Sequence, residues 1–269
     1  GKELAKMLAV IGAINGVAPV AAPVIGGLLT GSVGWQGIFM ILLFIGILLG
    51  IGCIRFKESL PAEKRSKTGV WATFRSFGII VHNRRYMLYV FQLAFAQGIL
   101  FAYIASSPFI IQQHYGFSPF AFSICFAVNA VAIGVAAALS VKFRRTENGT
   151  LTGCVGMLVF AVLQMAALYS GCGFWTYELL MFALLFMMGL TFTASTTLAM
   201  DCERRYAGAA SALLGALCFA SGGIVSPLVG LGDILISTGV TFVICAVCSL
   251  LCALWAVKRT GPKVALCRI

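Results

Sequence analysis

Residues 18–27 read Ala-Pro-Val-Ala-Ala-Pro-Val-Ile-Gly-Gly and lie inside an apolar run that covers approximately residues 7–29. A helix needs roughly 20 mainly apolar residues to cross a bilayer, so this run predicts a membrane-spanning helix. Each interior proline removes a backbone hydrogen bond and bends the helix. We therefore expect a kinked helix across the membrane.

Small or bent positions recur along one face of this helix, at steps of three or four residues. They are Gly12, Gly16, Pro19, Pro23, Gly26 and Gly27. Small residues let a neighbouring backbone approach closely in lipid, where packing drives helix association. The pattern favours a specialised contact face, and generic helix packing is the alternative.

The rest of the chain repeats the apolar pattern. Of the 269 residues, 61% are hydrophobic and 10% are charged, whereas a soluble domain is nearer 45–50% apolar and about 25% charged. A soluble enzyme, a disordered chain and a secreted disulfide scaffold are therefore excluded as classes. We predict an all-α integral membrane protein with eight spans, at 7–29, 35–54, 87–108, 119–142, 151–171, 175–199, 207–229 and 235–257.

The charges predict how these spans are oriented. The formal net charge is +11, and with the N-terminus inside, all 19 Lys and Arg residues fall on the inner side. This partition follows the excess of basic residues in cytoplasmic loops, and it predicts that both termini are cytoplasmic. The outer side carries two acids, Glu178 and Asp233, and we expect no ionisable residue near the centre of a span.

One long break divides the chain. Residues 58–86 form the predicted central cytoplasmic loop, between a part at 1–57 and a part at 87–269. Within the loop Val70, Trp71, Phe74 and Val81 recur near helical spacing, which predicts a short amphipathic helix on the membrane surface. A plain solvated linker is the alternative.

The first and seventh spans share a short pattern. Ala-Pro-Val-Ile-Gly at 22–26 matches Ser-Pro-Leu-Val-Gly at 226–230, and six spans separate the two copies. An even number of spans preserves orientation, so the match predicts a unit of six helices repeated in parallel. This is the plan of major facilitator transporters. On that plan, 1–57 holds the last two helices of the first half, and 87–269 holds the six-helix second half with a cytoplasmic tail.

The stretch at 18–27 resembles the fifth-helix antiporter motif of drug:proton antiporters in the major facilitator superfamily, and its double Ala-Pro form resembles the bicyclomycin-resistance (Bcr/CflA) subfamily. Residues 100–109 with Tyr115-Gly116, 207–213 and 226–230 also fit that subfamily. The resemblance implies that the eight spans are equivalent to helices 5–12 of the fold, without the first four. It also implies multidrug efflux and antibiotic resistance in a bacterial inner membrane, by alternating access.

The resemblance further implies that the motif packs against the eleventh helix, where the two halves meet. The expected residues on that helix are Gly208, Ser211, Gly215, Gly222 and Pro227. Proton-coupling acids of such antiporters mostly lie before the fifth helix, so we expect the proton site outside this chain. The expected partners are a small drug-like molecule, protons and lipids, without nucleic acid, and the expected state is a monomer. No cofactor is expected, because the proton gradient supplies the energy.

Polar side chains on otherwise apolar helices are candidates for the substrate pathway. They are Gln92, Tyr103, Asn129, Thr193 and Thr196. Polar groups in hydrocarbon are costly unless they pair or face a cavity, so interhelical hydrogen bonding is the alternative interpretation. No nucleophile–base pair or metal cluster occurs within the spans, so we expect no enzyme and no metal site. The alternative to transport is a truncated membrane protein with a structural or assembly role.

Overall fold

All the regular structure that is described is helical. The computed structural model describes residues 2–56, 77–140 and 142–258, and in the first helix it describes side chains at 25–29 and from 31 onward. Within these ranges the elements are helices, and no strand is present. The prediction of an all-α protein is confirmed.

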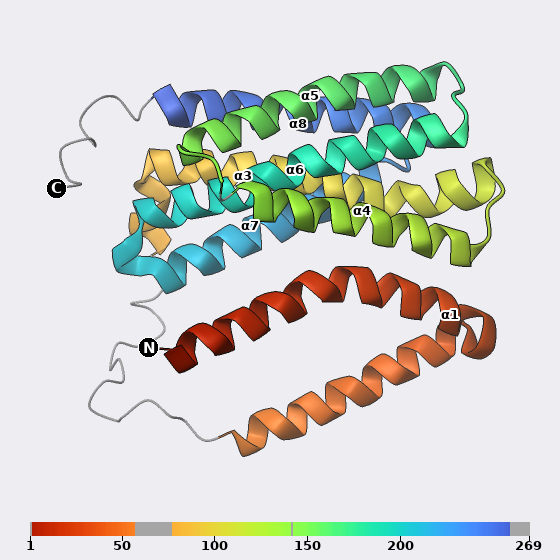
Figure 1. The fold of residues 1–269 in the computed structure, drawn as a ribbon, viewed down its shortest axis with the longest axis horizontal. Helices are drawn as coiled ribbons and strands as arrows, with labels where there is room; N and C mark the ends of the chain where they lie inside the picture. The colour runs from red at the N-terminus through yellow and green to blue at the C-terminus, as the bar shows by residue number, and fades with distance from the viewer. Residues whose placement is uncertain (1, 57–76, 141, 259–269) are drawn as a thin grey trace.

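The first helix, α1 (Lys2–Arg55), contains both of the first two expected spans. It breaks at Gly34, where φ is 65° and ψ is 179°. A positive φ is strained for residues with a side chain and is readily adopted by glycine. The two arms run antiparallel on either side of this break and form a hairpin beside the remaining helices (Figure 1). The predicted boundary between 7–29 and 35–54 is therefore correct.

The remaining helices form a bundle that begins after the central loop. They are α3 (Arg84–Pro108), the π-helical turn η2 (Phe109–His114), α4 (Pro119–Ser140), α5 (Thr146–Tyr169), α6 (Phe174–Cys202), the 3₁₀ turn η3 (Arg204–Tyr206), α7 (Ala207–Leu228) and α8 (Ile234–Lys258). The expected spans match these helices, with differences at the ends. For example, α5 begins five residues before the expected 151, because polar residues extend it and Glu147 in its first turn favours the helix N-terminus.

Seven helical segments within the described ranges are long and apolar enough to cross a membrane. They are Gly31–Arg55, Arg84–His114, Pro119–Ser140, Thr146–Tyr169, Phe174–Cys202, Arg204–Leu228 and Ile234–Lys258. The second arm of α1 is the most exposed of them, since none of its most apolar window is buried against the rest of the chain. Its side chains are suited to contact lipid or other helices.

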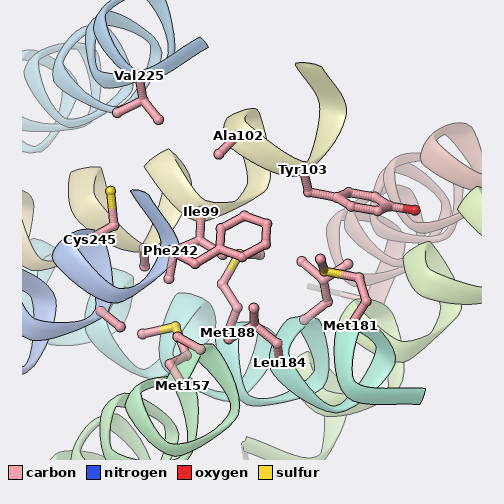
Figure 2. Packing of buried hydrophobic residues seen from close by; sticks show 14 of the residues in the cluster. Ile99, Ala102, Tyr103, Met157, Met181, Leu184, Met188, Val225, Phe242 and Cys245 are labelled. Carbon is pink, nitrogen blue, oxygen red and sulfur yellow. The ribbon is translucent and has the colours of Figure 1, made fainter. Parts of the chain in front are cut away.

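The core lies where α3 meets α5, α6, α7 and α8. Met157, Met181, Leu184 and Phe242 are fully buried there, and Figure 2 shows them interleaved between the ribbons. On the opposite face of α6 lies α4, which also packs against α1. The bundle α3–α8 is therefore a continuous packed unit, and α1 joins it along α4.

The start of α3 corrects one predicted boundary. The residues expected to form the surface helix, Val70, Trp71 and Phe74, lie outside the described part of the chain. Residues 77–82 are helical, and Ile80 is fully buried in a cluster with Tyr86 and Ala210. Asn83 then caps α3 by accepting a hydrogen bond from the Tyr86 amide at 3.2 Å. The bundle therefore includes residues that the sequence assigned to the central loop.

Basic residues gather at one end of the helices. Arg55 ends α1, Arg84 begins α3, and Lys258 ends α8. In Figure 1 these helix ends lie on the same side, together with the connections from α4 to α5 and from α6 to α7. The prediction that the basic residues lie together at one end of the helices is confirmed for the described residues. The assignment of that end to the cytoplasm stays a prediction.

Candidate functional site

Three helices bring polar side chains together inside the bundle. The Asn129 amide on α4 donates one hydrogen bond to the Tyr103 hydroxyl on α3, at 3.0 Å, and another to Glu178 Oε1 on α6, at 2.8 Å. Asn129 and Tyr103 are each only 1% exposed. We call Tyr103, Asn129, Tyr177 and Glu178 the carboxylate cluster. It links α3, α4 and α6 by side chains alone.

Aromatic packing orients the Tyr103 hydroxyl toward this cluster. The Tyr103 ring stacks on Phe126 of α4, with centroids 5.4 Å apart and planes 19° apart. Figure 2 shows the Tyr103 ring at the edge of the apolar core, with its hydroxyl pointing away from the labelled apolar side chains. The core therefore holds the ring, and the phenol is directed to the polar neighbours.

A further tyrosine, Tyr115, packs against Tyr177 of the cluster. Tyr177 is fully buried, and its ring lies 5.8 Å from that of Tyr115. The Tyr115 hydroxyl donates to the Cys172 carbonyl at 2.9 Å, which ties the α3–α4 connection to the α5–α6 connection. Burial and the contact with Cys172 raise the pKa of Tyr115, so it remains a neutral donor.

The carboxylate cluster contains an acidic group that has no counter-ion among the described residues. Glu178 Oε2 is buried and has no hydrogen-bond partner, and Glu178 forms no ion pair with the basic residues in the described ranges. Isolated buried carboxylates are costly, and proteins pair or protonate them. This arrangement can hold a proton or another positive charge.

Glu178 corrects an expectation from the sequence. Glu178 lies in the second turn of α6, at the end away from the basic residues, so its place among the outer-side acids is not contradicted. The spans were expected to lack a buried acid, however, and Glu178 packs against Asn129 of α4, whereas Asp233 is exposed and caps α8. Hydropathy could not reveal this, because a residue near the end of a span is counted with the loop. The polar Tyr103 and Asn129 on apolar helices were the available signal.

The five predicted pathway residues do not form one path. Tyr103 and Asn129 meet in the carboxylate cluster. Gln92 lies elsewhere in the bundle, fully buried between α3, α5 and α8, where its amide donates to the Ser249 hydroxyl at 3.1 Å. This contact favours the alternative interpretation of Gln92, interhelical hydrogen bonding, and its place on a substrate pathway stays a prediction.

Thr193 and Thr196 lie farther along α6, about 22 Å or more from Glu178 at 1.5 Å per residue. The Thr193 carbonyl accepts a hydrogen bond from Thr197, and the Thr196 hydroxyl is buried without a partner. They are separate from the carboxylate cluster, and their place on a substrate path stays a prediction.

One residue of the predicted half-interface, Gly27, packs against α4. Gly12, Gly16, Pro19 and Pro23 are helical, but their side chains lie outside the described set. Gly27 faces Ser123 of α4 so closely that a Cβ added there would clash with its hydroxyl. For the side chains that are described, α1 therefore packs against α4, and the expected packing of the motif against the seventh span stays a prediction.

The small residues of that seventh span, α7, have different surroundings. Gly222 packs against the Phe101 ring of α3. Gly208 and Gly215 have open space within 4 Å of a built Cβ, and Ser211 and Pro227 are exposed. These four positions of α7 are therefore not packed tightly against the described side chains.

These features define a multi-pass α-helical membrane protein with a buried carboxylate in its bundle. Residues 1–227 match the family model of the Major Facilitator Superfamily, and the chain belongs to this family. The relatives include the uncharacterized MFS-type transporter YdgK of Bacillus subtilis, 36% identical over 240 residues, which are 87% of this chain and 60% of the relative.

Two further relatives carry names that refer to drugs. The bicyclomycin resistance protein homolog of Haemophilus influenzae is 27% identical over 241 residues, which are 84% of this chain and 58% of the relative. The multidrug transporter MdfA of Edwardsiella ictaluri is 25% identical over 115 residues, which are 43% of this chain and 28% of the relative. The chain spans about 60% of the length of the first two relatives. The resemblance drawn from residues 18–27 is confirmed at the level of the family and these relatives.

Proposed function

We propose that this chain takes part in the proton-coupled export of drug-like amphiphilic molecules. The observation that carries the proposal is its similarity, over 84% of its residues, to a relative named for bicyclomycin resistance. The family match over residues 1–227 and the membrane-spanning helices agree with transport as the general activity. Proton coupling is part of the proposal because the bundle holds a carboxylate without a counter-ion.

The mechanism we propose is alternating access between two halves of a transporter. The packing of α1 supports it, because α1 forms a separate hairpin that meets the bundle along α4. At this contact Gly27 removes the side chain that would otherwise interlock with Ser123. A close but smooth contact allows helices to slide, as relative motion of two halves requires.

The basic end of the helices indicates how the proposed exporter is oriented in the membrane. Basic loops are retained in the cytoplasm, so the basic end faces inward and both termini are cytoplasmic in a bacterial inner membrane. Export then moves substrate from the basic end to the opposite end. The proton gradient, directed inward, supplies the energy for this movement.

Drug accumulation in bacteria tests this function. We expect a drug-sensitive strain that expresses the complete reading frame containing this chain to accumulate less ethidium than a strain with an empty vector. The difference should disappear when an ionophore collapses the proton gradient. The chain alone is a second arm, which measures whether these residues suffice for export.

Paired glycine variants sharpen the test. Gly27→Leu should abolish the difference in accumulation, because a large side chain collides with Ser123, whereas Gly31→Leu faces open space and should retain it. Membrane levels of both variants must match those of the parent protein. If accumulation is unchanged by expression, or if the reduction survives loss of the gradient, proton-coupled export is wrong.

A further inference from the structure

The carboxylate cluster has more hydrogen-bond acceptors than donors. Both donor contacts of the Asn129 amide are used, toward Tyr103 and Glu178. Asn129 Oδ1 and Glu178 Oε2 are buried acceptors without a partner, and the Tyr177 hydroxyl is also buried and unpaired. Unsatisfied buried polar atoms are rare in folded proteins and require an explanation. A proton on Glu178 Oε2 would turn this unpaired acceptor into a donor.

Asn129 suits both charge states of the neighbouring carboxyl group. A side-chain amide carries a donor and an acceptor, and rotation by half a turn exchanges them. It donates to Glu178 when the carboxylate is charged, as in the present geometry. After such a rotation its oxygen accepts from Glu178 when the carboxyl group is protonated. Glu178 therefore has a partner before and after it binds a proton.

The remaining titratable groups around Glu178 are three phenols and a thiol. Tyr103 comes from α3, Cys125 from α4, Tyr177 from α6 itself and Tyr115 from the connection after η2. The other helices packed against α6 add no titratable group that interacts with Glu178 within the described ranges. Among the described residues, no cationic side chain pairs with this carboxyl group.

Because the unpaired oxygens are buried, the site suits a proton and not a larger cation. Glu178 Oε2 and Asn129 Oδ1 are both covered, so an organic cation has no access to them in this conformation. A proton needs no cavity and can reach a covered oxygen by transfer through a hydroxyl or a transient water.

We propose that Glu178 is a reversible proton-binding residue in the C-terminal bundle, with Asn129 as its partner in both states. The proton binds one carboxylate oxygen and leaves from it, and no other bond changes. This inference rests on the proposed proton coupling and gives it a location on α6. Because Asn129 and Tyr103 belong to α4 and α3, the binding of a proton changes hydrogen bonds across three helices.

Infrared spectroscopy of the purified full chain in lipid bilayers tests the proposal without transport. Difference spectra between high and low pH should show the carbonyl stretch of a buried carboxylic acid, shifted by deuterium exchange. Glu178→Gln should remove this band. Asp233→Asn is the matched control, since asparagine also caps a helix and Asp233 is an exposed acid on α8. It should leave the band in place.

A second variant tests the role of Asn129. Asn129→Leu should keep the band but raise its midpoint by about one pH unit, because the lost hydrogen bond to the charged carboxylate is roughly twice as strong as one to the neutral carboxyl group. Elution profiles and helical circular dichroism must match those of the parent chain.

Two results would overturn the inference: a band that persists in Glu178→Gln, or a Glu178 carboxylate that stays ionised at every pH tested. An unmoved midpoint in Asn129→Leu would remove Asn129 from the site. A failure of drug export in cells leaves the infrared band unaffected, so the two proposals fail separately.

Discussion

Tyr86 shows how a single side chain fixes two helices at the basic end. It is fully buried, and its hydroxyl donates to the Ala210 carbonyl at 2.6 Å. Tyr86 lies in the first turn of α3, and Ala210 lies in the first turn of α7. The two helices start side by side because this bond and the surrounding apolar contacts hold them there.

Removal of that hydroxyl should weaken the bundle measurably. We expect Tyr86→Phe to lower the free energy of unfolding by about 0.5–1.5 kcal/mol, since a buried hydrogen bond is lost while the ring is retained. Tyr169→Phe is the control, because Tyr169 is 80% exposed. Thermal unfolding of the two variants in detergent should differ, and equal midpoints would contradict this role for Tyr86.

At the residue scale, sequence reasoning identified polar positions but could not assign their partners. Gln92 and Asn129 are the same kind of signal, a lone amide on an apolar helix. The structure places Gln92 against Ser249 and places Asn129 against Glu178. These partners are 157 and 49 residues away along the chain. Only the packing of the helices decides which amide meets a carboxylate.

At the scale of elements, glycines fix how closely the helices approach. A Cβ added to Gly189 on α6 would lie 2.5 Å from the Ile133 carbonyl oxygen on α4. Gly153 of α5 has an equally close contact with α6, and Gly239 of α8 lies against Met165 of α5. Small residues therefore occur at three helix–helix contacts, as expected where packing and not water drives association.

Alanine at one of these contacts should force α4 and α6 apart. Overpacked sites typically lose about 1–3 kcal/mol, so we expect Gly189→Ala to lower the thermal unfolding midpoint. Gly134→Ala on α4 has open space around the added methyl group and should be neutral or slightly stabilising. The same midpoint for Gly189→Ala and Gly134→Ala would show that the close approach is not required.

The sequence predicted where the helices lie along the chain, but it did not predict which helices pack against each other. Apolar runs located all six helices of the bundle, and Gly34 separated the two arms of α1 as the spacing indicated. The packing of α1 on α4 was missed, because the stripe of small residues on α7 offered an equally plausible partner. A one-dimensional pattern shows that a face can pack closely, but it does not show against which helix.

At the scale of the whole molecule, the chain combines a packed six-helix bundle with a far more exposed hairpin. The second arm of α1 keeps large side chains such as Leu42, Phe44 and Leu49 more than half exposed. Exposed apolar surface of this extent marks contact with lipid or with other protein. In the proposed transporter this hairpin belongs to the first half, and the bundle forms the second.

The central claim is that substrate movement is tied to proton movement, and paired flux in one preparation tests it most directly. The protein encoded by the complete reading frame would be reconstituted into proteoliposomes that are loaded with a pH-sensitive dye. Ethidium transport would be followed in the same sample. We predict that ethidium crosses the membrane only under an imposed proton gradient, and that protons move in the opposite direction at the same time. Ethidium transport at equal rates with and without the gradient, or transport without any proton movement, would contradict the account.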